Sequence, residues 1–550
     1  MPNADGKTSG YGTDDTTGIN NRRHFLQMGA ATGALALLAP LIEACGGPSS
    51  SSQTSSAVKG SGGSVLVATL AETFTKFDPR TNADIAGIVV TDLVFEGITR
   101  RDPASGQVTN QLADSMPEMI NDKTCRVTIR PGAKFQDGTP VTPADVIYTL
   151  KTMQSPSLGS LYQPYLSIFA DARAVGDNVV EFDLAFPTSL VNDRLTFLRV
   201  VPKALIESKG VNAFAVHPVG SGPYQFVSAI ANDKITLQRS PTYNGKIANS
   251  TPRIELLQQT NPSAAVNSLL TGQTAVMDGV PFNDLATLGR NSSIKTASVP
   301  GHLEALVLFN CVKPPLNDVR VRQAFLYAIN REQIVKGVYL GNATVANSVF
   351  APSDSAYVRP STVYDYNPDK AKALLSAAGH SSGFDLELMV ANQGIMTSVA
   401  PIIQSNLNAV GIKTTIKTGD TEALYTYVTN GSYQAYFAPA DWAVFGLDPD
   451  LMLSWLYQGS FAKEYLYWTT PEAKEFSGVL DAALRESNPS SAQTGWAKAQ
   501  NIIADNVPAF PLFLLNEASA YWKDIEDFTP GSDAGLNMVG VTAGSWKPRG

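Results

Sequence analysis

Downstream of residue 65 the sequence alternates between strand-like and helix-like segments, which restricts the fold to layered α/β architectures. Polar and apolar residues alternate over 124–129, as in a half-buried strand. Thr142 is suited to cap a helix that has Pro143 at its first position, and Asn367 precedes a proline in the same way. The same alternation predicts strands at 65–70, 384–390 and 412–416 and helices at 369–378 and 401–410.

The first 45 residues have the layout of an export signal. A basic pair, Arg22 and Arg23, precedes an apolar run over 25–42, and Cys45 follows shortly after that run. This order predicts export, and the paired arginines favour the twin-arginine route. Cys45 follows a small residue and is similar to a lipoprotein acylation site. The alternative is a single-pass anchor helix, although the run is barely as long as the roughly 20 residues that span a bilayer.

Residues 46–64 are rich in glycine and serine and are predicted to be a flexible tether. The whole chain has 550 residues, 16% of them charged, and a formal net charge of −8. This length allows two or three domains. The sequence contains no basic stripe of the kind that binds nucleic acid, so we expect no nucleic-acid partner.

Three cysteines are too few for a disulfide scaffold. Cys125 alternates with apolar residues, so we expect it to face a core as a small hydrophobic side chain. Cys311 follows another strand-like run. The two could form a disulfide in an oxidising compartment, but their separation in sequence gives that pairing no local support.

Five runs in a fixed order together resemble the oligopeptide/dipeptide class of solute-binding proteins of ABC importers, family 5. Taken by themselves, these runs indicate elements of the fold and not a ligand site. They predict a strand and turn, a glycine-rich bend that lets chain segments approach closely, and capped helix starts. The runs cover 127–146, 219–224, 310–332, 366–375 and 448–450.

The resemblance implies an α/β, two-lobed, periplasmic-binding-protein-like (class II) fold with a discontinuous larger lobe and an extra subdomain. Such proteins close about a hinge and hold a solute between the lobes. The predicted parts are a signal peptide (1–45), a tether (46–64), lobe I (65–98, 213–309 and 506–550), subdomain II (99–212) and lobe III (310–505).

The resemblance also implies the function and the partners. We expect an extracytoplasmic protein that captures a peptide or related small organic solute and delivers it to a membrane permease powered by a separate ATPase. We expect a monomer, attached to the membrane through a lipid on Cys45. No catalysis, cofactor or metal is expected.

The segment 438–450 is the main candidate for the ligand site, because Trp442 lies in a loop-like stretch and aromatic walls suit variable organic side chains. In peptide-binding relatives an aspartate in this segment pairs with the ammonium of the peptide. This chain has Phe445 at that position. Either Asp441 or Asp448 substitutes, or the ligand lacks a free amine, since an unpaired buried ammonium costs several kcal/mol. Ordinary core packing is the alternative for Trp442.

Further candidates lie in loops at strand ends, which commonly line α/β clefts. Two tyrosines are candidates for the wall of the site, although tyrosines at a solvent edge are common. These secondary candidates are Phe74, Thr75, Asn392, Gln393, Tyr425 and Tyr433.

An exported hydrolase or a sensory receptor on the same fold is the alternative function. Ser292 and Lys295 match S-x-x-K, and 417–419 match K-T-G, in the order found in penicillin-recognising serine enzymes. Such short patterns recur by chance, and the third polar element is absent between them. The four histidines, His24, His217, His302 and His380, are too dispersed to predict a metal site.

Overall fold

The computed structural model describes residues 65–549 except 75, 83, 103–104, 248–250, 441–445 and 533–536, and it leaves the side chains of residues 421 and 422 undescribed. Several predicted residues therefore lie outside the described part of the chain: Arg22, Arg23, Cys45, Thr75, Asp441, Trp442 and Phe445. Within that part, no helix is long and apolar enough to cross a membrane.

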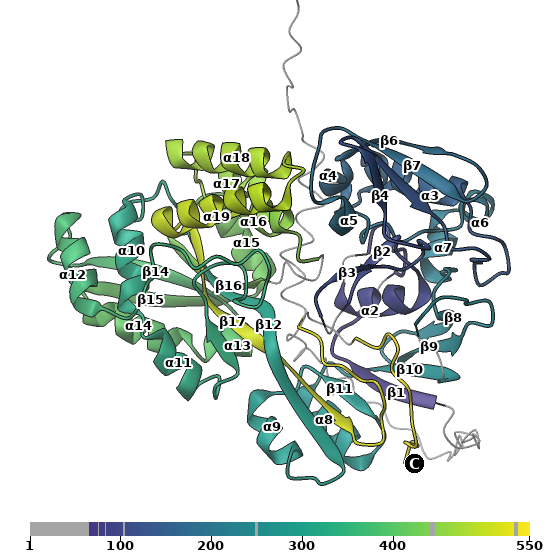
Figure 1. Ribbon diagram of the computed structural model, residues 1–550. Coiled ribbons are helices and arrows are strands. Elements are labelled where there is room, and N and C mark those ends of the chain that lie inside the picture. Colours follow the sequence, from purple (N-terminus) through teal and green to yellow (C-terminus); the bar gives the residue numbers. More distant parts are fainter. Residues whose placement is uncertain are drawn as a thin grey trace, which may run out of the picture.

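The chain folds into two lobes, which confirms the predicted α/β architecture (Figure 1). The largest sheet has eleven strands. In spatial order ten of them are β15 (Ile412–Gly419), β14 (Phe384–Ala391), β16 (Ala435–Ala440), β12 (Ile294–Phe309), β17 (Ala509–Trp522), β11 (Val276–Asp278), β1 (Val65–Leu70), β10 (Arg253–Gln258), β9 (Lys234–Arg239) and β8 (Tyr224–Ile230); β13 (Ala343–Val345) pairs with β17.

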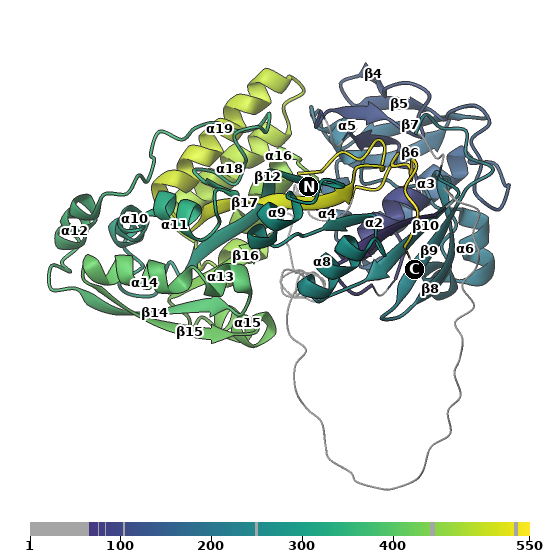
Figure 2. The ribbon, with the colours of Figure 1, turned by 90° about the horizontal axis from the view of Figure 1, so that it is seen from below.

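Subdomain II contains two smaller sheets and lies beside lobe I in Figures 1 and 2. One sheet pairs β2 (Thr99–Arg101) with β3 (Val108–Asn110), and the other has the order β4 (Glu118–Asn121), β5 (Thr124–Thr128), β7 (Val179–Leu184), β6 (Phe169–Ala174). The helices here are α3 (Pro143–Gln154), η1 (Pro156–Leu158), α4 (Gln163–Leu166), α5 (Val191–Arg194) and α6 (Lys203–Lys209).

The remaining helices belong to the two lobes. Those on the side of lobe I are α2 (Ile85–Val94), α7 (Val211–Val216), α8 (Pro262–Thr271) and α9 (Phe282–Leu288). Those of lobe III are α10 (Val319–Ala328), α11 (Arg331–Gly337), α12 (Pro368–Ala377), α13 (Gly394–Thr397), α14 (Ala400–Ala409), α15 (Thr421–Thr429), α16 (Pro449–Tyr457), α17 (Gly459–Glu464), α18 (Pro471–Leu484) and α19 (Pro489–Asn506).

The helix starts follow the predicted capping chemistry. Thr142 and Asp145 form a capping box at the start of α3. The Asn367 side chain accepts a hydrogen bond from the Lys370 amide at the start of α12, with Pro368 at the first helical position. The predicted strands at 124–129, 384–390 and 412–416 appear as β5, β14 and β15.

Two long antiparallel strands, β12 and β17, connect the lobes and run from one to the other in Figure 1. Their register shifts between Val299 and Leu303. Gly301 lies in this irregular stretch, where an added Cβ would come within 2.5 Å of the Leu515 carbonyl oxygen. Glycine therefore permits the close backbone approach at the point where the strands pass between the lobes.

The glycine-rich bend 219–224 brings chain segments together as predicted. A Cβ at Gly220 would lie 2.0 Å from the Val94 carbonyl oxygen, so only glycine fits. Cys125, which we expected to face a core, is buried, and Cys311 is buried as well; both are free thiols. The disulfide that the sequence left open is therefore not formed.

Buried apolar side chains form two main clusters. One lies in lobe I, and the other is continuous from subdomain II into lobe III. Continuity of the second cluster means that subdomain II packs directly on lobe III in this structure.

Candidate functional site

The junction between subdomain II and lobe III contains a buried ion pair network. Arg194, the last residue of α5, lies between two carboxylates at the start of α16. Its Nε is 2.8 Å from Asp448 Oδ2, and its Nη2 is 2.6 Å from Asp450 Oδ2. The Arg194 side chain is 0% exposed and that of Asp448 is 1% exposed. The network therefore joins the two parts of the molecule away from water.

The Asp448-Pro449-Asp450 sequence also builds the helix that presents these carboxylates. Asp448 caps α16, because its Oδ1 accepts a hydrogen bond from the Leu451 amide at 3.0 Å. Pro449 occupies the first helical position, and Asp450 lies in the first turn. One motif thus supplies both a helix start and two partners for Arg194.

Burial and charge set the protonation of this network. Burial raises the pKa of Asp448 to about 7, and the nearby Asp450 carboxylate adds to the rise while Arg194 opposes it. Burial also raises the pKa of Asp450. The pKa of Arg194 is lowered by burial, but the two carboxylates outweigh that effect and raise it overall. Burial thus raises the pKa of both carboxyls, and the Arg194 guanidinium opposes the rise at each.

Aromatic rings surround the ion pair network. The Arg194 guanidinium carbon lies 4.9 Å from the centre of the Tyr165 ring, and Tyr165 stacks on Trp455 of α16 with ring centres 6.1 Å apart. Gly446 has a φ of 115°, and a Cβ there would lie 3.0 Å from Phe197. The chain at Gly446 thus lies directly against subdomain II.

A second contact between subdomain II and lobe III lies near the end of α18. The Ser189 amide donates to the Glu486 carbonyl oxygen at 2.8 Å. The Arg485 guanidinium carbon lies 4.1 Å from the centre of the Phe186 ring. The lobes are therefore closed on each other at this junction, as well as joined by β12 and β17.

Other candidates of lobe III lie at the carboxyl ends of three parallel strands. β14 is parallel to both β15 and β16, with Ala391 opposite Gly419 and Val390 opposite Phe437. Asn392 and Gln393 follow β14 at this edge, and β16 ends there at Ala440. Loops at such an edge form the binding crevice in open α/β sheets. Asn392 is exposed, whereas Gln393 is buried.

The two candidate tyrosines both contact Tyr465. The Tyr425 and Tyr465 rings meet edge to face with centres 5.3 Å apart. The Tyr433 hydroxyl donates to the Tyr465 carbonyl oxygen, and its side chain is fully buried. Tyr433 therefore supports the core, and its place in the wall of a site stays a prediction.

Phe74 lies away from these residues, in lobe I. Its ring packs near Phe77 with centres 5.4 Å apart, and it is half-buried against the lobe I core. The structure therefore separates Phe74 from the lobe III candidates, which would approach it only across the space between the lobes.

Sequence reasoning missed two buried charged residues, Arg194 and Glu304. Glu304 of β12 is 0% exposed and pairs with Ala440, the last residue of β16. Burial raises the pKa of Tyr457 well above its usual value, and the Glu304 carboxyl adds to that rise. A glutamate within the apolar run 303–309 is an unusual sequence signal that could have identified this position.

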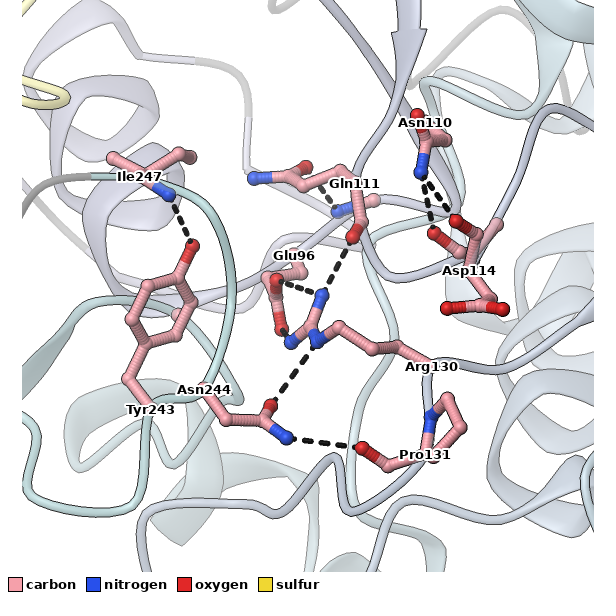
Figure 3. Close-up of polar contacts among 12 residues, drawn as sticks. Glu96, Asn110, Gln111, Asp114, Arg130, Pro131, Tyr243, Asn244 and Ile247 are labelled. Carbon is pink, nitrogen blue, oxygen red and sulfur yellow. Dashed lines mark hydrogen bonds and ion pairs between the residues drawn. The ribbon is translucent and has the colours of Figure 1, made fainter.

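A different buried charge pair connects lobe I to subdomain II. Figure 3 shows Arg130 donating to both oxygens of Glu96 at 3.1 Å, to the Gln111 carbonyl oxygen and to Asn244. Burial is the main cause that raises the pKa of Glu96, and Arg130 opposes it. Each guanidinium nitrogen of Arg130 has a partner within the protein, so we interpret the cluster as a structural junction.

The S-x-x-K match does not have the geometry of a catalytic serine–lysine pair. Ser292 lies in a turn, and Lys295 is an exposed residue of β12 with its Nζ 5.7 Å from the centre of the Tyr521 ring. The two residues therefore do not share a helical turn, which that chemistry needs. The part of the chain that the structure describes contains no group of three or more potential metal ligands.

Comparison with known proteins identifies the fold and its relatives. The profile described as "Bacterial extracellular solute-binding proteins, family 5 Middle" matches residues 107–464. The glutathione-binding protein GsiB of Salmonella paratyphi A is 27% identical over 493 residues, which cover 86% of this chain and 93% of that protein.

Solved structures agree with this assignment at the level of the fold. The dipeptide-binding protein of Pseudoalteromonas sp. SM9913, in complex with Met-Leu, has a TM-score of 0.74 and 21% identity, covering 87% of this chain and 99% of that one. DppA from Helicobacter pylori, in complex with the peptide STSA, has a TM-score of 0.75 and 22% identity, covering 88% and 98%.

Proposed function

This chain belongs to the bacterial extracellular solute-binding proteins of family 5, and from that premise we propose that its ligand is a short peptide or a peptide-like small organic solute. The chain is a solute-binding protein of an ABC importer that acts outside the cytoplasm. The observation that carries the ligand class is the similarity to a glutathione-binding protein over 93% of its length. The family consists of binding proteins, and the comparisons give no support to a hydrolase or a sensory receptor.

The proposed ligand site lies at the carboxyl edge of β14 and β16, between the lobes. There Trp442 and Phe445 would provide apolar walls, and Asn392 and Gln393 would provide polar groups. The hinge would be β12 and β17, the two strands that pass between the lobes.

A peptide ligand bound at this edge would need a carboxylate to pair with its free ammonium group. The Asp448 carboxylate already pairs with Arg194 and caps α16, so turning toward a ligand would break both interactions. Of the two aspartates that the sequence suggested, we therefore propose Asp441.

Attachment to the membrane is a further proposal. Export through the Arg22-Arg23 signal and acylation of Cys45 would keep the protein near its permease, and the tether 46–64 would leave the lobes free to move. Two acyl chains would anchor firmly, whereas one would anchor only marginally. We propose that the protein is a monomer and that its domain boundaries are those predicted from the sequence.

Native mass spectrometry and calorimetry test the ligand class. Protein purified without denaturation is examined for a retained small molecule and is then titrated with glutathione, with the dipeptide Met-Leu and with a nickel–histidine complex. Tight binding of either peptide, or retention of a peptide mass, is the expected result. Binding of only the nickel complex, or retention of a solute without amide bonds, would overturn the proposal.

A further inference from the structure

His302 lies at the point where β12 passes between the lobes. It follows Gly301, within the stretch where the register of β12 and β17 shifts. Its side chain is only 2% exposed. A change in the angle between the lobes would therefore alter the surroundings of a buried histidine.

The two ring nitrogens of His302 both face oxygen atoms that accept hydrogen bonds. Nε2 lies 2.9 and 3.1 Å from the two carboxylate oxygens of Asp354, which also accepts the Ala351 amide at 2.7 Å. Nδ1 lies 3.3 Å from the Ser532 carbonyl oxygen. A neutral imidazole has one N–H, so it would direct a lone pair at one of these acceptors. The geometry therefore favours the doubly protonated, cationic imidazole, in which both nitrogens donate.

The Ser532 carbonyl belongs to lobe I. Ser532 follows β17 in the chain and lies on the segment 526–532. In this segment Phe528 packs against the lobe I core, with its ring centre 4.7 Å from that of Tyr521. The backbone amide of His302 also donates to the Ser532 carbonyl oxygen, at 3.2 Å. This side of His302 is therefore fixed to lobe I.

The Asp354 carboxylate belongs to lobe III. It lies in the loop 346–358, whose Ala356 carbonyl oxygen accepts a hydrogen bond from Gln500 Nε2 of α19 at 2.8 Å. The loop is therefore held on lobe III. The side chain of His302 thus bridges the two lobes at the strand that connects them.

We propose that His302, as a cation, is a positioning residue of the hinge, which stabilises the closed arrangement by connecting Ser532 of lobe I to Asp354 of lobe III. Rotation of one lobe away from the other separates these acceptors, so the imidazole keeps at most one of them. The inference rests on the proposed function in one respect, namely that the lobes open to admit a ligand.

The charged groups around His302 favour a cation. No basic residue occurs in β17, in the loop 346–358 or in the segment 526–532; their charged residues are Glu517, Asp354, Glu526 and Asp527. On β12 itself, Glu304 follows two residues later, whereas Lys295 lies near the other end of the strand, over the Tyr521 ring. Acidic neighbours stabilise an imidazolium relative to a neutral ring.

The direction of the pH dependence follows from linkage. The closed arrangement uses both N–H groups of His302, so it binds the second imidazole proton more tightly than an open arrangement that has lost one acceptor. An ordinary imidazole loses that proton near pH 6.5. Below about this pH both arrangements carry the proton and closure is independent of pH. Above it, the closing equilibrium weakens by at most about tenfold per pH unit.

Distances between two spin labels measure closure without a ligand. Exposed residues of the two lobes, Asn267 of α8 and Lys372 of α12, are replaced by cysteine and labelled in full-length protein that carries Cys45→Ser. The buried native thiols Cys125 and Cys311 should not react. The closed fraction of the parent is expected to fall as the pH rises from 6 to 9.

Three variants separate this role from a merely structural one. His302→Gln removes the cation, so its closing equilibrium at pH 6 should be about tenfold weaker than that of the parent and should no longer depend on pH. Asp354→Asn keeps an oxygen for the Ala351 amide but removes the charge, and it should weaken closure at pH 6 in the same direction. His380→Gln, which removes a histidine of lobe III away from β12, should follow the parent at every pH.

The outcomes distinguish failure of this role from failure of the proposed ligand class. A His302→Gln profile that follows the parent, or a label distance in the parent that never changes with pH, would overturn the role of His302. If His302→Gln does not fold, Asp354→Asn decides, and parent-like closure at pH 6 in that variant would overturn it. Glutathione titrations of the same proteins report the ligand separately. A pH-dependent distance without glutathione binding would support His302 and count against the ligand class.

Discussion

The Arg194 guanidinium lies 2.8 Å from the Asp448 carboxylate, although the two residues are 254 positions apart in the sequence. This contact joins subdomain II to lobe III in the closed structure. It also explains why Asp448, which the sequence suggests as a partner for a ligand ammonium, has a different role. A carboxylate that already has a buried cation and a helix amide as partners gains little from a second cation.

Replacing Gly220 by alanine is expected to destabilise the fold strongly. The new Cβ would lie 2.0 Å from a backbone oxygen of residue 94, and neither segment can move without losing packing. We expect a loss of at least about 2 kcal/mol in the free energy of unfolding, measured by urea denaturation. Gly478→Ala in α18 is the control, because an added Cβ there has no neighbour within 4 Å and alanine favours a helix by about 0.5–1 kcal/mol. Equal effects of the two substitutions would contradict this explanation.

The thiols of Cys125 and Cys311 are expected to resist labelling in the native protein. Burial raises the pKa of Cys125 to about 12 and that of Cys311 to about 11, so the reactive thiolate is scarce at pH 8. Labelling with a maleimide, located by peptide mass spectrometry, should occur at these two residues only after denaturation. Rapid native labelling of either one would show that its surroundings open to solvent.

Trp442→Ala is expected to weaken ligand binding. If Trp442 lines the pocket, loss of its ring should lower the affinity at least tenfold, as for an aromatic residue at the centre of an interface. Calorimetric titration with the ligand retained by the purified protein checks this. Tyr366→Ala, an exposed residue of lobe III, serves as the control and should bind as the parent does. Unchanged affinity in Trp442→Ala would remove this residue from the site.

Cys45→Ala is expected to release the protein from the membrane. If the lipid on Cys45 is the sole anchor, the variant should be recovered in the soluble or secreted fraction after salt washing, whereas the parent stays with membranes. Persistent membrane association of the variant would instead indicate that the apolar run over 25–42 is retained as an anchor helix.

Much of the local structure follows from the sequence. The capping residues Thr142 and Asn367 predict where α3 and α12 begin, because a side-chain oxygen there satisfies amides that have no partner within the helix. The alternating pattern over 124–129 similarly predicts β5. These signals act between residues that are near one another in the chain, so a single sequence contains them.

The roles of charged residues at long range could not be predicted in this way. The residues near Arg194 in the sequence do not indicate that its partner lies more than 250 residues away. Glu304 is unusual in the sequence only because it is an acidic residue within an apolar strand. The sequence alone determined the α/β class, the helix starts and the family resemblance. Only the tertiary structure decided that Asp448 pairs with Arg194 across the lobes and that the two cysteines stay free, because burial and distance are properties of chain segments brought together by folding.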